Sequence, residues 1–115
     1  GGYLPAPLKK PGGKTVIHVV AIITAKPGQR AAILNNFAAN RPAVLAEAGC
    51  IEYGAAVDVE NMGTAAYGPD AFVVIEKWES PDHLKAHAAA PHMKAYGAKT
   101  KDMVASRAIH VLKPV

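Results

Sequence analysis

The sequence has one cysteine, few aromatic residues and no long apolar run, and each of these scarcities excludes a class of protein. Cys50 alone cannot form an internal disulfide, and a lone thiol fits a reducing compartment, so we expect a cytoplasmic protein. No run of about 18 apolar residues occurs, which excludes a transmembrane helix. The 13 lysines and arginines are scattered without interleaved aromatic residues, so a net charge of +4 does not indicate nucleic-acid binding. We therefore expect neither a membrane nor a nucleic acid as partner.

A glycine-rich phosphate loop between a strand and a helix is also missing. Pro11-Gly12-Gly13 precedes the first predicted strand, so it does not match the loops that bind dinucleotides or nucleoside triphosphates. We therefore expect no bound cofactor.

A length of 115 residues suits one domain. Residues 1–14 combine prolines, glycines and lysines without periodicity, so we expect an extended N-terminal arm there and a single domain over residues 15–115. Alanine supplies 23 residues, whereas Val, Ile, Leu and Phe together supply only 26. A chain with so few large apolar residues gains stability by burying more surface against a copy of itself.

The first half of the domain predicts a strand, a helix and a second strand. Residues 16–23 are apolar on both alternating faces, which is typical of a strand covered on both sides. A helical apolar stripe follows over residues 33–45, with Pro42 inside it and Gly49 expected as its C′ cap. Residues 51–59 alternate between apolar and polar side chains and predict the second strand.

The second half repeats this order after a loop at residues 60–70. Residues 71–79 predict a strand with two largely apolar faces. Ser80-Pro81-Asp82 is a strong helix start, and the helix is expected to break at Pro91 and then resume. Residues 107–113 predict the last strand.

This order, β-α-β followed by β-α-β, predicts an α+β fold of the ferredoxin-like split type. Right-handed crossovers place both helical segments on one face of a four-stranded antiparallel sheet. Because the strands at residues 16–23 and 71–79 are apolar on both faces, the other face must be covered as well. We expect a homodimer packed sheet to sheet.

Five short blocks along the chain resemble those of the antibiotic biosynthesis monooxygenase family, and within it the bacterial quinol monooxygenases. In chain order they are Ala25-Lys26-Pro27-Gly28-Gln29, Glu47-Ala48-Gly49-Cys50-Ile51-Glu52-Tyr53, Ile75-Glu76-Lys77-Trp78-Glu79-Ser80, Leu84-Lys85-Ala86-His87 and Pro91-His92-Met93. The resemblance implies a dimeric α/β barrel. It also implies oxidation of an electron-rich quinol or polycyclic phenol with O₂, without metal or flavin.

The same resemblance leaves other activities open. Relatives degrade haem, isomerise small signalling molecules or have no known reaction, so a non-catalytic, stress-related barrel is an alternative. The haem-degrading branch carries an Asn on its first strand, and residues 16–23 contain none. The alanines of the second helical segment favour an open cavity over one filled with side chains.

A cofactor-free oxidation needs an apolar cavity, a base and hydrogen-bond donors, because a deprotonated dihydroxyaromatic ring can itself reduce O₂. Trp78 corresponds to a Trp that the family often places in its pocket, although it could equally plug the core. Glu76 and Phe72 share its strand face, and Tyr53 lies on the apolar face of the second strand. We expect these four side chains to bind substrate. A buried Glu76 also requires a polar partner.

His92 and His87 are the candidate catalytic residues, with His92 preferred as the base. His92 follows Pro91 at a helix start, where the helix dipole favours the neutral imidazole, and His87 is expected to orient or bind the substrate. Either histidine could instead be structural.

The remaining histidines and the cysteine favour structural roles. His83 and His87 are spaced i, i+4, but no third metal ligand is apparent, so we expect no metal site. His18 and His110 are expected at the dimer interface, and Cys50 as a small buried apolar residue.

Overall fold

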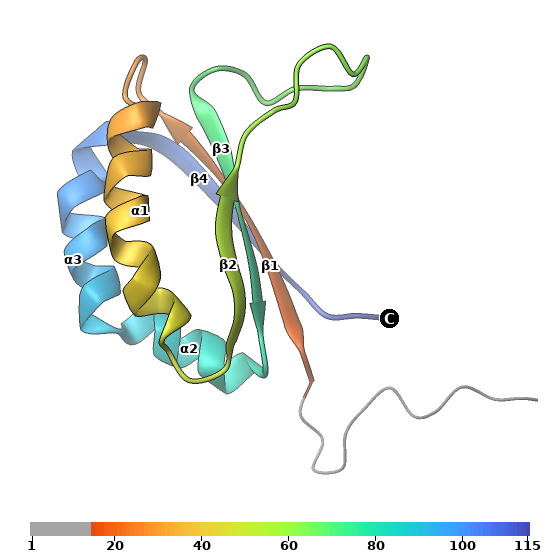
Figure 1. Ribbon diagram of the computed structural model, residues 1–115, viewed down its shortest axis with the longest axis vertical. Coiled ribbons are helices and arrows are strands. Elements are labelled where there is room, and N and C mark those ends of the chain that lie inside the picture. The colour runs from red at the N-terminus through yellow and green to blue at the C-terminus, as the bar shows by residue number, and fades with distance from the viewer. Residues whose placement is uncertain (1–14) are drawn as a thin grey trace, which may run out of the picture.

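The computed structural model describes residues 15–115, so the arm expected over residues 1–14 lies outside the described part. Helices pack on one side of a twisted sheet (Figure 1). The elements are β1 (Ile17–Ala25), α1 (Arg30–Leu45), β2 (Cys50–Ala56), β3 (Ala71–Trp78), α2 (Pro81–Ala89), α3 (Pro91–Thr100), a short 3₁₀ helix η1 (Lys101–Met103) and β4 (Val104–Leu112).

The sheet confirms the predicted α+β class and its four antiparallel strands, in the order β2-β3-β1-β4. β1 and β3 are the central strands, which explains why both read as apolar on both faces. Pro91 separates α2 from α3, as expected. The preceding residue, Ala90, has the extended backbone that a following proline favours (φ −65°, ψ 140°).

Three predicted boundaries are wrong. β2 ends at Ala56 instead of residue 59, since the Asp58 carboxylate accepts hydrogen bonds from the backbone N–H groups of Tyr67 and Gly68 and closes a loop instead of continuing the strand. β4 begins at Val104, directly after η1, and not at residue 107. Gly49 is not the C′ residue of α1, because α1 ends at Leu45 with Ala46 as its C-cap.

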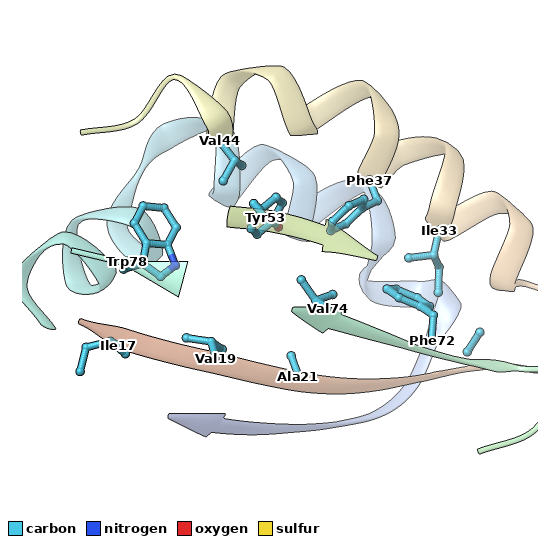
Figure 2. Packing of buried hydrophobic residues seen from close by; sticks show 11 residues of the cluster. Ile17, Val19, Ala21, Ile33, Phe37, Val44, Tyr53, Phe72, Val74 and Trp78 are labelled. Atoms are coloured by element: carbon cyan, nitrogen blue, oxygen red, sulfur yellow. The ribbon is translucent and has the colours of Figure 1, made fainter. Parts of the chain in front are cut away.

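The core lies between the helices and one face of the sheet (Figure 2). Trp78 at the end of β3 is fully buried, and so is Val44 of α1. Phe37 of α1 stacks on Tyr53 of β2, with ring centroids 5.0 Å apart and nearly parallel planes. These large side chains fill the layer that the alanine-rich helices leave between themselves and the sheet.

No helix of residues 15–115 covers the opposite face of the sheet, here called the outer face (Figure 1). In the strand register, Val20 of β1 lies opposite Ile75 of β3, and Ile22 lies opposite Val73. Ile75 is 41% exposed in the single chain. Apolar side chains at the centre of an uncovered sheet face are typical of a protein interface.

No helix within residues 15–115 combines the length and apolar character that crossing a membrane requires.

Gly49 occupies the turn between α1 and β2, and its backbone (φ +79°) lies in the left-handed region that favours glycine. A Cβ built on it would come within 2.3 Å of His83 Cγ and 2.8 Å of His83 Cβ, the inner part of that side chain. The turn is held against β3, because the Glu79 backbone N–H donates to the Gly49 carbonyl at 2.9 Å.

We expect Gly49→Ala to lower the free energy of unfolding by about 2–4 kcal/mol, because backbone strain and a steric clash add. Gly28→Ala is the matched control: its φ is also positive (+77°), but an added Cβ meets nothing within 4 Å. It should lose only about 1 kcal/mol. Urea denaturation of both variants checks this, and equal losses would contradict the steric account.

Candidate functional site

A cavity of about 440 Å³ lies between the sheet and the helices. Its walls are largely apolar, with Val19 and Ala21 from β1, Ile33 and Phe37 from α1, and Val74 from β3. Its volume falls in the range of small-molecule sites, which is about 300–1,000 Å³.

The polar lining residues differ in exposure. Tyr53, Glu76 and His87 are buried and form what we call the buried end, whereas the side chains of Lys94 on α3 and Arg107 on the edge strand β4 are exposed. Tyr96 and Thr100 of α3 also line the cavity.

The residues that line the cavity are spread along and across the sheet. β1 pairs Val19 with Glu76 of β3, and it pairs Ile23, four residues further along, with Arg107 of β4 on its other side. At a strand rise of about 3.3 Å per residue and a strand spacing of about 4.8 Å, the backbones of Glu76 and Arg107 are separated by about 13 Å along the strands and about 10 Å across them. This separation suits a planar system of two or three fused rings.

His87 is carried by the last turn of α2, where it is only 5% exposed. The local sequence explains its position: the Ser80 side chain caps the helix by accepting from the His83 backbone N–H, and Pro91 ends the segment beyond Ala90. The imidazole packs against the Trp78 ring at a centroid distance of 4.6 Å and against Tyr53 at 5.5 Å. The ring is therefore held between aromatic walls at the buried end.

Glu76 has the polar partners that its burial demands. Trp78 Nε1 donates to Glu76 Oε1 at 2.9 Å, and His87 Nε2 lies 3.8 Å from the same oxygen. Burial raises the pKa of Glu76 above its usual range, the Trp78 hydrogen bond and the nearby His87 act in the opposite direction, and Glu47 adds to the rise. The carboxyl group therefore keeps its proton to a higher pH than an exposed glutamate.

Glu47 joins the two candidate histidines. Its Oε2 atom lies 2.8 Å from His87 Nδ1 and 2.8 Å from His92 Nε2. The three residues come from the turn after α1, the last turn of α2 and the first turn of α3. Glu47 is not among the site residues that the sequence predicts, although it opens the second family block. The available signal was a pair of histidines flanking a proline, because a buried imidazole needs a hydrogen-bond partner.

The structure brings three of the six predicted site residues to the cavity: Tyr53, Glu76 and His87. Burial raises the pKa of the Tyr53 hydroxyl far above its usual range, so it stays protonated and remains a hydrogen-bond donor. Phe72 and Trp78 are buried in the core and are not among the lining residues. Trp78 acts on the site through Glu76 and the His87 ring, which it contacts directly.

His92 does not line the cavity. It lies in a separate shallow hollow with Asn36, Asn40 and Lys99, and its side chain is 29% exposed. The preference for His92 as the base over His87 is therefore not supported by the geometry.

His83 and His87 have separate polar partners. His83 Nδ1 is 2.7 Å from Ser80 Oγ, whereas His87 Nδ1 is bonded to Glu47. Within residues 15–115, no group of three or more His, Cys, Asp or Glu side chains is arranged to hold a metal ion. His18 and His110 lie in register with Leu112 and Val20 on the outer face of the sheet.

Comparison with known proteins agrees with this architecture. The family model of antibiotic biosynthesis monooxygenase matches residues 16–99. The chain is 42% identical over 102 residues to "Probable quinol monooxygenase YgiN" of Escherichia coli K12, an alignment that covers 86% of this chain and 98% of the relative. Shigella flexneri has a relative of the same name, with the same identity and coverage.

Solved structures share the fold. PA3566 from Pseudomonas aeruginosa superposes with a TM-score of 0.75 at 25% identity, covering 88% of this chain and 95% of that one. A conserved protein from Methanosarcina mazei Go1 reaches a TM-score of 0.76 at 23% identity, covering 89% and 95%. With the family model matched over most of the domain, the chain belongs to the antibiotic biosynthesis monooxygenase family.

Proposed function

We propose that this monooxygenase oxidises a quinol of two or three fused rings with O₂, and that the substrate itself supplies the electrons in place of flavin or metal. The observation that carries the proposal is His87 at the buried end of a largely apolar cavity. The relative from Escherichia coli, which bears the name of a probable quinol monooxygenase, supports the substrate class.

The proposed reaction begins with loss of a hydroxyl proton from the bound quinol. The resulting anion transfers an electron to O₂, and the semiquinone and superoxide combine at a ring carbon. Loss of water then gives the hydroxylated quinone, so one quinol and one O₂ yield one hydroxyquinone and one H₂O. The protein must remove the first proton and keep bulk water away from the radical pair.

His87 suits the role of base better than His92. Its Nδ1 atom faces Glu47, which leaves Nε2 on the side of Glu76 and the cavity. The Tyr53 hydroxyl is proposed to donate to an oxygen of the substrate, a role supported by the position of Tyr53 at the same buried end. The open volume also argues against the alternative of a barrel filled by its own side chains.

We expect the purified protein to consume O₂ with a dihydronaphthoquinone or an anthrone when neither flavin nor NADH is added. A general base contributes about 10²–10⁴-fold, so His87→Gln should lower kcat by at least the smaller factor. His92→Gln is the comparison, and it should lose much less because His92 lies outside the cavity. An oxygen electrode measures the rate of O₂ consumption by the wild type and by both variants.

Two outcomes would contradict this account. A requirement for flavin, or inhibition by a chelator, would exclude the cofactor-free reaction. A larger loss in His92→Gln than in His87→Gln would show that the base is not the histidine at the buried end.

The proposed partner is a second copy of the chain, packed through the outer face. Val20, Ile22, Val73 and Ile75 form its apolar centre on the two middle strands. Covering this centre in a homodimer would complete the dimeric α/β barrel that the family resemblance implies.

We expect light scattering to show a dimer at micromolar concentration, with an interface above about 1,200 Å². Ile75→Asp places a charge in the outer face and should dissociate the dimer into monomers. Leu45→Asp is the control, because Leu45 is similarly exposed but lies on α1, on the opposite side of the sheet. A stable wild-type monomer would contradict the proposal.

Glu76 is proposed to keep its proton to a higher pH than an exposed carboxyl group, which lessens the negative charge beside the quinolate. Its pKa is raised by burial, so the folded protein binds this proton more tightly than the unfolded chain does. The contribution of Glu76 to stability therefore falls as the pH rises from the ordinary carboxyl range through the raised pKa.

Glu76→Gln removes this titration and keeps an oxygen for the Trp78 N–H. We expect the stability of the variant relative to wild type to increase as the pH rises through that window, as measured by thermal unfolding from acidic to slightly alkaline pH. A difference that is independent of pH would show that Glu76 titrates alike in the folded and unfolded states.

A further inference from the structure

We propose that Glu47 is the positioning residue of the site: its carboxylate holds the proton of His87 on Nδ1 and so leaves Nε2 as the free basic atom toward the cavity. The inference rests on the proposed function for its catalytic meaning. Its structural content, the protonation pattern of His87, stands on the geometry alone.

The hydrogen-bond chemistry at Glu47 Oε2 carries the argument. An ionised carboxylate only accepts hydrogen bonds, so each ring nitrogen that bonds to it must donate. His87 Nδ1 and His92 Nε2 both lie 2.8 Å from this single oxygen, a distance typical of charge-assisted hydrogen bonds. In the neutral imidazole of His87, the proton on Nδ1 leaves the lone pair on Nε2.

The backbone explains why this arrangement is rigid. The Glu47 N–H donates to the Val44 carbonyl at 2.9 Å, and the Cys50 N–H donates to the Glu47 carbonyl at 3.2 Å. Glu47 is thus bonded on both sides within the turn that joins α1 to β2, and its side chain is only 13% exposed. A carboxylate held in this way can orient a ring without itself touching the substrate.

The charge of Glu47 also serves the reaction. When His87 takes the substrate proton onto Nε2, it becomes an imidazolium with a proton on each nitrogen, and the adjacent anion stabilises that cation. His92 supplies the second hydrogen bond to the same oxygen from its more exposed position, which further compensates the burial of the carboxylate. His92 therefore supports Glu47, and Glu47 positions His87.

Long-range ¹H–¹⁵N correlation spectra of the uniformly labelled full chain test the inference directly, with the His87 signals assigned by their loss in His87→Gln. When its imidazole is neutral, wild-type His87 should show a protonated Nδ1 and an unprotonated Nε2. The protonation pattern itself is read from the wild type, and a proton on Nε2 there would overturn the inference.

The variant Glu47→Gln provides a second test. Its side-chain amide can donate or accept a hydrogen bond, so it no longer requires His87 Nδ1 to carry the proton. We expect the His87 tautomer to become mixed or inverted and kcat for a dihydronaphthoquinone to fall about 10- to 100-fold, with KM little changed. Glu79→Gln is the matched control: Glu79 also faces a histidine, His83, at 4.0 Å, but its side chain is 51% exposed and it does not line the cavity. The control should change neither the tautomer nor turnover.

The outcomes separate the two proposals. An unchanged His87 tautomer and unchanged turnover in Glu47→Gln would overturn the role of Glu47. A tautomer that depends on Glu47, in a wild-type protein that oxidises none of the quinols, would support the role of Glu47 and contradict the proposed function.

Discussion

Two carboxylates, Glu47 and Glu76, lie inside an otherwise apolar layer, and the need to satisfy them organises one end of the molecule. A buried carboxylate without partners is strongly unfavourable, so each must find donors or keep its proton. His87 lies between the two, with Nδ1 on Glu47 and Nε2 near Glu76. The indole of Trp78 and the ring of His92 complete the chain of contacts. The same interactions that make the burial tolerable also hold a basic nitrogen at the cavity.

The cavity follows from the one-sided cover of the sheet. Large side chains such as Phe37, Tyr53 and Trp78 fill part of the layer, whereas α2 and α3 contribute small residues over the rest. Ala88 and Gly97 both line the cavity, so the small residues of these helices do leave room for a ligand. At the sheet edge, the helix-side residues of β4 are exposed, which leaves that side of the cavity open.

Much of the fold could be predicted from the sequence, because it depends on local patterns. Apolar residues on both alternating faces identified β1 and β3 as strands covered on both sides, and Ser80-Pro81 and Pro91 indicated the starts of α2 and α3. The errors came from side chains that interact across the chain. The Asp58 carboxylate ends β2 early by accepting hydrogen bonds from backbone N–H groups nine and ten residues away. Glycine is needed at position 49 because a Cβ there would clash with His83, and not because α1 ends at that residue.

The candidate site could be predicted only in part, for a related reason. Tyr53, Glu76 and His87 follow from strand alternation and helix position, which are local. Glu47 resembles a solvated charge beyond a helix end, and only the packing of α2 and α3 against its turn buries it. The relative place of His87 and His92 also depends on this packing, because both are close to Pro91 in sequence but lie on different sides of the helical layer.

The most direct test of the account is a crystal structure of the protein with a dihydronaphthoquinone bound under exclusion of O₂. The account predicts density for a flat ring system in the cavity between the sheet and the helices, with one hydroxyl oxygen within hydrogen-bond distance of His87 Nε2. A ring bound on the outer face or beside His92, with the cavity closed by side chains, would contradict it.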